Sequence, residues 1–217
     1  MSGINDNKQA VLIARMLKDA NQALIETPTI VSARRLATDL AFFCREKIMI
    51  LPEDEGEDFR YEAKSRAYDA RRLAVLSALA GGEKAVIIAP SSAMDAALPS
   101  AGEFKAHRLF LTRGGTIERE DIIKELIAMG YERMPSCEAF GEFSVRGDII
   151  DVFGPGMDDP VRIELFDDEI DSIRTYDSFP QRSIENLKEI RISRTVLDAS
   201  EENQGSILDY LKKTLWS

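Results

Sequence analysis

The run Ala85-Val86-Ile87-Ile88-Ala89 is apolar at every position. A strand with apolar side chains on both faces is buried on both faces, and such strands belong to parallel sheets that helices cover. Two shorter apolar stretches, at residues 23–25 and 48–51, are also expected to be strands, and apolar residues recur at helical spacing around them. The first half of the chain is therefore predicted to be an α/β domain with a parallel sheet.

Three helices are expected around these strands. Thr29 is placed to cap the second helix, and Gly81-Gly82 to end the third, which runs from about residue 61 to residue 80. The positions expected to face inward are Leu12, Ile13, Met16, Leu17 and Ala20 in the first helix, Ala33, Leu36, Ala37, Leu40 and Phe43 in the second, and Leu73, Leu76 and Leu79 in the third.

The pattern changes after the third strand. Residues 91–105 are small and polar and are expected to form a linker or a domain boundary. A strand over residues 108–112 and a helix from Thr116 to Gly130 are expected next. From Tyr131 onward short strands and turns dominate, so the second half is predicted to be α+β.

The expected organisation is an α/β domain over residues 1–106 and an α+β domain over residues 107–193. Residues 194–217 are expected to be the start of a truncated following segment, because an amphipathic helix begins at residues 207–211 shortly before the sequence stops.

The composition excludes few classes of protein. Hydrophobic residues make up 44% of the chain and charged residues 30%, which is ordinary for a globular protein with a buried core. No apolar run approaches the roughly 20 residues that span a bilayer. Cys44 and Cys137 are isolated, which fits a reducing cytosol. The net charge of −10 argues against nucleic-acid binding by this chain alone, because phosphate contacts need a basic face.

A nucleotide loop is the first candidate for chemistry. Residues 2–9 precede the first helix, where a phosphate-binding loop would lie. Of the G-x-x-x-x-G-K-[ST] pattern only Gly3 and Lys8 remain, and Gly3 is one residue closer to the lysine than the pattern requires. Asn7 replaces the second glycine, and Gln9 replaces the hydroxyl residue that would hold magnesium. The stretch is interpreted as a degenerate loop that no longer supports ATP hydrolysis.

Other catalytic or metal sites are not expected. His107 is the only histidine, so no partner could activate Cys137 as a nucleophile. The acidic stretch at residues 167–171 lacks the spacing and the glycine of a calcium loop. It is interpreted as a solvated turn.

Residues 142–176 form the most informative region, because they predict a strand-rich platform. Gly147-Asp148 suits a tight turn between strands at 142–146 and 149–153, with the glycine in a left-handed conformation. Residues 161–166 alternate cleanly, so that Arg162, Glu164 and Phe166 are expected to point outward.

Arg146, Arg162 and Phe166 are the residue types that anchor protein interfaces. Ten acidic residues surround three arginines in this region, so protein carboxylates are better partners than phosphates. The alternative is that both arginines pair with neighbouring acidic residues of the same sheet. The pattern does not decide between these two interpretations.

The same region carries a family resemblance. Residues 141–153, 160–174 and 181–183 closely resemble the UvrB-homology region of the bacterial transcription-repair coupling factors, and residues 130–133 and 207–211 fit as well. UvrB shares this motif, but it keeps an intact phosphate loop and inserts a tyrosine-rich DNA-clamping hairpin. Here the loop is degenerate, and the interval between Pro52 and Tyr61 is short and acidic.

The resemblance implies a UvrB-like fold that has lost ATP hydrolysis, and a module of nucleotide excision repair that recruits UvrA by mimicking UvrB. It places the UvrA contacts at Arg146, Arg162 and Phe166, with Glu164 as a further candidate. In that family a DNA-translocating ATPase displaces stalled RNA polymerase. Its contacts with polymerase and DNA, and its ATP and magnesium, are expected outside this chain, so no cofactor is expected here.

The resemblance also implies a cytoplasmic protein with no membrane partner. The alternative function is a UvrB-type nucleotide- or DNA-binding module.

Overall fold

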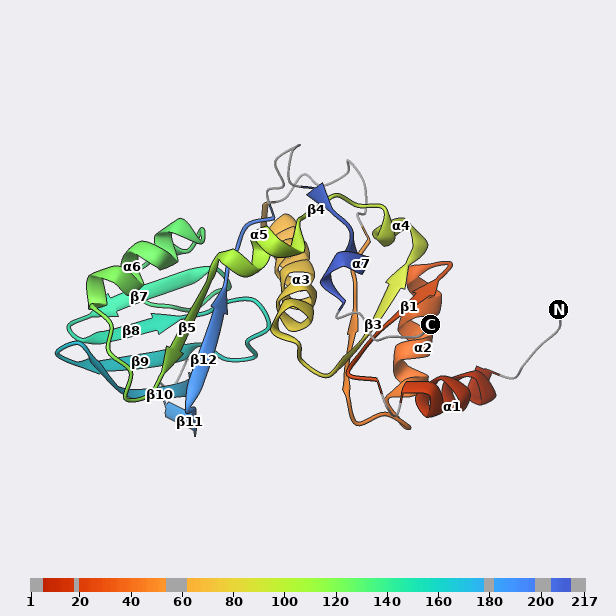
Figure 1. Cartoon of the computed structure of the whole chain (residues 1–217), viewed down its shortest axis with the longest axis horizontal. Coiled ribbons are helices and arrows are strands. Elements are labelled where there is room, and N and C mark those ends of the chain that lie inside the picture. Colours follow the sequence, from red (N-terminus) through yellow and green to blue (C-terminus); the bar gives the residue numbers. More distant parts are fainter. Residues whose placement is uncertain (1–5, 18–19, 54–61, 178–181, 198–203, 212–217) are drawn as a thin grey trace. The chain divides into compact units, whose positions relative to one another are not determined.

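The computed structural model describes residues 6–17, 20–53, 62–177, 182–197 and 204–211, and the side chains of residues 6–9 and 62–66 are not described. The chain divides into two compact units (Figure 1). The first comprises residues 1–101 and 198–217, and the second residues 102–197. No helix within the described ranges is long and apolar enough to cross a lipid bilayer.

A three-stranded parallel sheet forms the centre of the first unit. Its order is β1 (Gln22–Thr27), β3 (Ala85–Pro90) and β2 (Lys47–Ile50). Strand β3 lies in the middle and is buried at every position. The parallel sheet predicted from the apolar run is therefore confirmed, because a central strand needs apolar side chains towards both covering layers.

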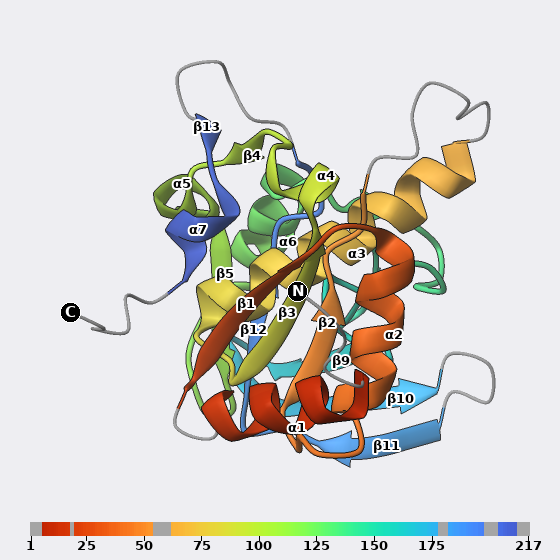
Figure 2. The ribbon, with the colours of Figure 1, turned by 90° about the vertical axis from the view of Figure 1, so that its right-hand side faces the viewer.

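Helices cover both faces of this sheet (Figure 2). Helices α1 (Asp6–Leu17) and α2 (Ile30–Leu40) share one core with Val86 and Ile88. Helix α3 (Glu62–Gly81) contacts β3, where Ala85, Ile87 and Ala89 alternate to the opposite face.

Most of the expected helix details are confirmed. Thr29 caps α2, since its side chain accepts a hydrogen bond from the Ser32 amide. Leu73, Leu76 and Leu79 of α3 are buried. Three of the positions expected to face inward were wrong. Leu12 and Met16 of α1 are exposed, and Phe43 is exposed because α2 ends at Leu40 and Phe43 leaves the helical stripe.

A linker or a domain boundary was expected at residues 91–105. The two units do divide within this stretch, after residue 101, but the stretch is not an irregular linker. This stretch forms the short helix α4 (Ser91–Met94), strand β4 (Leu98–Pro99) and helix α5 (Ala101–Ala106). Strand β13 (Gln204–Gly205) pairs with β4, and helix α7 (Ile207–Tyr210) follows it. The Tyr210 hydroxyl donates to the Pro99 carbonyl at 2.7 Å. The last described residues thus return to the first unit, which differs from a separate segment over 194–217.

The second unit contains a six-stranded sheet and a two-stranded ribbon. The sheet has the order β11-β10-β9-β8-β7-β6, and the ribbon pairs β12 with β5. The strands are β5 (Arg108–Thr112), β6 (Glu132–Arg133), β7 (Glu142–Arg146), β8 (Ile149–Val152), β9 (Val161–Phe166), β10 (Glu169–Asp177), β11 (Arg182–Asn186) and β12 (Glu189–Ser193).

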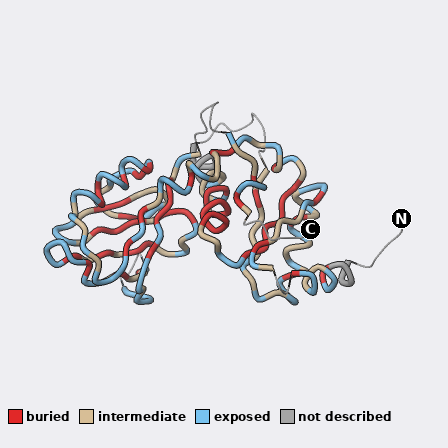
Figure 3. The backbone as a smooth tube through the Cα atoms, viewed as in Figure 1, coloured by how far each residue is buried: buried red, intermediate tan, exposed pale blue. Residues whose placement is uncertain are grey.

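One face of the six-stranded sheet is buried. Phe143, Ile150 and Ile163 pack there with residues of the ribbon and of helix α6 (Arg119–Ala128), and Figure 3 shows buried positions along these strands. Helix α6 begins later than expected from Thr116, because that residue pairs with Glu169 in an isolated bridge. The opposite face carries the charged residues described next.

Candidate protein-docking site

The outward face of the six-stranded sheet carries a row of polar side chains. Strand pairing places Ser144 opposite Asp151, Asp151 opposite Arg162, and Arg162 opposite Arg174. In β9 the predicted alternation is observed: Val161, Ile163 and Leu165 are buried and the residues between them are not. The row crosses four neighbouring strands, so positive and negative groups from distant parts of the sequence meet on one face.

Asp151 is the centre of this row. Its carboxylate is only 1% exposed and accepts from Arg162 Nε at 2.7 Å, from Arg162 Nη2 at 2.8 Å and from Arg146 Nη2 at 3.0 Å. The pairing with Arg162 is bidentate, which is the strongest geometry for these two groups. Both arginines therefore pair within the sheet, so the interpretation that they satisfy neighbouring acidic residues describes this structure.

The two arginines differ in how much of each remains available. The Arg162 side chain is 12% exposed, and its guanidinium carbon lies 4.4 Å from the centroid of the Tyr176 ring. The hydrogen bonds to Asp151 raise the pKa of Arg162 above its ordinary value. The Arg146 side chain is 52% exposed and makes a single hydrogen bond to Asp151. Arg146 thus offers the larger part of a guanidinium to solvent.

Tyr176 supports Arg162 from a buried position. Its hydroxyl donates to the carbonyl of Cys137 at 3.5 Å, and burial raises the pKa of Tyr176 above its ordinary value. Burial also raises the pKa of the Cys137 thiol to about 12. The thiol of Cys137 is therefore held in its neutral form near pH 7.

Glu164 pairs with the following strand. Its carboxylate accepts hydrogen bonds from both terminal nitrogens of Arg174, and from the Ser172 hydroxyl at 2.6 Å. The hydrogen bonds from Arg174 lower the pKa of Glu164 below its ordinary value. The carboxylate is thus held ionised and fixed in place beside the Asp151 row.

Phe166 ends β9 and is 75% exposed. It precedes the two-residue turn Asp167-Asp168, in which Asp167 has φ of 54°. Aspartate tolerates this left-handed conformation, so the turn forms without a glycine. A large aromatic side chain that is exposed beside a turn is typical of an interface anchor.

The turn between β7 and β8 is held from helix α6. Arg146 pairs with Ile149, so Gly147-Asp148 forms the predicted two-residue turn, and Gly147 has φ of 62°. Arg119 at the start of α6 donates to the Gly147 carbonyl at 3.0 Å and lies 3.7 Å from the Asp148 carboxylate. These contacts fix the end of β7 that carries Arg146.

The sequence interpretation missed three members of this site, namely Asp151, Tyr176 and Arg174. Asp151 could have been noticed as a lone acid inside an apolar strand, and the two-residue turn places it opposite Ser144. Asp151 meets Arg162 because β8 and β9 pair in one particular register. Residues 153–160 connect these strands, and no local pattern in them predicts that register.

The remaining candidates belong to the part of the sequence that forms the first unit. Gly3 lies outside the described residues, and Lys8 lies within α1, beyond the start of that helix at Asp6. Within the described part of the chain, no group of three or more His, Cys, Asp or Glu side chains is arranged to hold a metal ion.

Comparisons with known proteins agree with this geometry. Residues 109–195, which contain every member of the site, match the UvrB interaction domain family. The chain is 32% identical over 194 residues to the transcription-repair-coupling factor of Bacillus subtilis, and 34% identical over 195 residues to those of Staphylococcus aureus and Staphylococcus haemolyticus. These matches cover 88–89% of this chain but only 16–17% of the relatives' length. The chain therefore belongs to the transcription-repair-coupling factor family and carries that family's UvrB interaction domain.

Proposed function

We propose that this chain docks UvrA through the outward face of its six-stranded sheet, and that it does so in place of UvrB. The observation that carries the proposal is the position of half-exposed Arg146 and exposed Phe166 on the UvrB interaction domain. An arginine and an aromatic on a rigid sheet are the residue types that dominate the binding energy of protein interfaces.

Arg146 supplies the direct charge contact. Asp151 holds one terminal nitrogen and leaves the rest of the guanidinium for a carboxylate of the partner. Phe166 supplies the apolar anchor, because its ring already lies outside the core. Fixing the Arg146 side chain before binding reduces the conformational entropy lost in the complex.

Arg162 and Glu164 have a different role in this proposal. Arg162 is largely covered and fully engaged with Asp151 and Tyr176, so it holds the carboxylate that orients Arg146. Glu164 is paired with Arg174 and keeps the neighbouring strand charged and fixed. Arg162 and Glu164 are thus positioning residues more than direct contacts.

The chain is proposed to do no chemistry and to need no cofactor. In the full-length protein we propose that an ATP- and magnesium-dependent motor outside this chain acts on DNA and on stalled RNA polymerase. The site of action is proposed to be the cytoplasm. The first unit would then be a UvrB-like scaffold whose nucleotide loop, at Gly3 and Lys8, no longer functions.

A binding titration against purified UvrA tests the proposal. Arg146→Ala and Phe166→Ala should each weaken binding by roughly 2–3 kcal/mol, the loss typical of central interface residues. Circular dichroism and thermal unfolding should remain close to those of the original chain, since neither side chain lies in the core.

Two substitutions provide matched controls. Arg191 is 51% exposed and pairs with Glu189 at 3.1 Å, so it resembles Arg146 but lies on β12. Phe42 is an exposed phenylalanine of the first unit. Arg191→Ala and Phe42→Ala should leave UvrA affinity unchanged. Original affinity in both Arg146→Ala and Phe166→Ala would contradict the proposal.

The competing function is a UvrB-type nucleotide or DNA binder. It predicts that the chain alone binds an ATP analogue, or that it retards duplex DNA in an electrophoretic mobility assay in a salt-dependent manner. Either result without UvrA binding would favour that alternative.

A further inference from the structure

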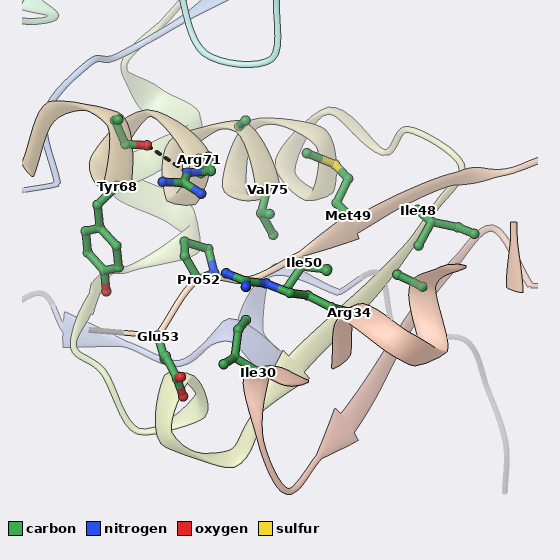
Figure 4. A pocket seen from close by; sticks show the side chains of 13 residues that line it. Ile30, Arg34, Ile48, Met49, Ile50, Pro52, Glu53, Tyr68, Arg71 and Val75 are labelled. Atoms are coloured by element: carbon green, nitrogen blue, oxygen red, sulfur yellow. Dashed lines mark hydrogen bonds between the residues drawn. The ribbon is translucent and has the colours of Figure 1, made fainter. Parts of the chain in front are cut away.

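A second feature lies in the first unit. A pocket of about 760 Å³ lies beside β2, between α2 and α3 (Figure 4). Arg34 comes from α2, Ile48 and Ile50 from β2, and Arg71 and Val75 from α3. Pockets of this size hold ligands of several hundred daltons or a few residues of a peptide.

The pocket contains the outer edge of β2. The Leu51 amide donates to the Ile88 carbonyl at 2.9 Å, so alternate residues of β2 direct their backbone groups towards β3. The amides and carbonyls of Ile48 and Ile50 therefore point towards the opposite edge. Among the described residues these groups pair with no other strand. An unpaired edge of this kind is a template for another strand.

Two arginines reach into the same hollow. Figure 4 shows Arg34 and Arg71 extending from α2 and α3 towards Pro52. Arg71 Nε donates to the Ala67 carbonyl at 3.1 Å, and neither guanidinium forms an ion pair with a described carboxylate. Glu53 also lines the pocket, but its carboxylate accepts from the Ser92 hydroxyl at 2.5 Å.

A third positive charge lies behind the pocket wall. Tyr68 lines the pocket, and its hydroxyl accepts from Nη1 of Arg72 at 2.6 Å. The Arg72 side chain is buried, and its other terminal nitrogen has no hydrogen-bond partner among the described residues. Three guanidinium groups therefore lie around this apolar hollow. The carboxylate of Glu53 lines the same pocket, and Asp69 lies close enough to Arg72 to interact with its charge.

We propose that the edge of β2 binds an extended segment of another protein that carries two adjacent acidic residues between apolar ones. The segment would add to the sheet as a strand, with its backbone on Ile48 and Ile50. Successive side chains of a strand point to opposite faces, so one acid would meet Arg34 and the next would meet Arg71.

A free phosphate compound explains these features less well. It would match the arginines, but it would leave the backbone groups of Ile48 and Ile50 unpaired and the apolar lining uncovered. Peptide addition satisfies the backbone edge, the apolar lining and both guanidinium groups together. The observations therefore favour the acidic peptide.

The test uses fluorescence anisotropy with a labelled peptide, Thr-Val-Glu-Asp-Val-Thr-Val, and the whole 217-residue chain. We expect saturable binding that weakens with salt. Arg34→Gln and Arg71→Gln should each weaken it about tenfold, as loss of one charge-assisted pair predicts. Arg35→Gln, on the same helix but outside the pocket, is the matched control and should retain the original affinity.

Two changes in the peptide separate charge from strand addition. A Gln-Asn version tests the acids, and a version with methylated backbone nitrogens tests the strand hydrogen bonds; both should bind at least about tenfold more weakly. UvrA affinity should not change in the pocket variants, so this result is independent of the proposed docking function.

Several outcomes would overturn the proposal. They are no peptide binding by a folded chain, equal binding by the methylated peptide, or original affinity in both arginine variants. Tighter, Arg34-dependent binding of inorganic phosphate or ATP would identify a small anion as the ligand. Peptide binding only after Asp54, Glu55, Glu57 and Asp58 are replaced by amides would make the chain's own acidic stretch the occupant.

Discussion

In the second unit, Arg146 and Arg162 share the carboxylate of Asp151, whereas Arg34 and Arg71 of the first unit pair with no carboxylate among the described residues. Arg146 and Arg162 lie on strands β7 and β9, whereas Arg34 and Arg71 lie on helices α2 and α3 and line the pocket beside β2. The two regions differ because only the second unit buries a carboxylate beside its arginines. Asp151 is almost fully buried, and a buried carboxylate is stable only with cations close to it.

This difference separates two roles that the same residue type can have. An arginine that neutralises a buried carboxylate contributes to folding and fixes its neighbours, while an arginine without an acidic partner contributes little to stability and remains available for a ligand. The following substitutions test whether that separation holds.

The largest effect is expected from Arg162→Ala. It removes the bidentate partner of a buried carboxylate and the cation over Tyr176, so the second unit should lose roughly 3 kcal/mol of stability. Hydrogen exchange at the amides of β8 and β9 measures this loss directly, since the two units need not unfold together. A loss no larger than that of Arg146→Ala would remove the distinction between the two arginines.

A smaller effect is expected from Asp151→Asn. The amide keeps the volume but removes the charge, so Arg146 loses its fixed orientation and UvrA binding should weaken by about 1–2 kcal/mol. A double-mutant cycle with Arg146→Ala should show a coupling of about 1 kcal/mol. Additive effects would mean that Asp151 does not act through Arg146.

The pairing of Glu164 with Arg174 predicts a modest pH dependence. The folded-state pKa of Glu164 is lowered, so its contribution is present above the unfolded value near 4.5 and is lost as pH falls through the lower folded value. Denaturation monitored between pH 6 and about pH 3 should show this loss. In Glu164→Gln the acid-dependent part should be reduced, and an identical pH profile would contradict the assignment.

The smallest effect is expected in the first unit. Arg34→Gln and Arg71→Gln should change the unfolding free energy by less than about 0.5 kcal/mol, because no described carboxylate loses a partner. Urea denaturation measures the unfolding free energy of each variant, and the loss in Arg162→Ala is the reference value. Destabilisation close to that of Arg162→Ala would place these arginines in the fold rather than in a binding pocket.

Much of the fold follows from short stretches of sequence. The apolar run at β3 predicted the parallel sheet, and the alternation of β9 predicted which side chains face outward. Residues 91–105 were interpreted as a linker because α4, β4 and α5 are too short to show a periodic pattern.

The candidate site was predictable only in part. Arg146, Arg162, Glu164 and Phe166 were identified from alternation and from the family resemblance, and the structure places them on strands β7 and β9. Their partners were not identified. Asp151 meets Arg162 only in the observed register of β8 against β9, and the connection between these strands is too long for its sequence to predict that register. The pocket at β2 was missed since it needs α2, β2 and α3 together.

The sequence by itself determined the local features: the strand periodicity, the left-handed turn at Gly147 and the helix cap at Thr29. Each depends on residues within a few positions of one another, where backbone conformation and side-chain periodicity act directly. The tertiary structure decided which charges are paired. Asp151 neutralises arginines from two other strands, while Arg34 and Arg71 line one pocket beside the edge of β2. Only the packing of distant segments sets the distances on which ion pairing depends.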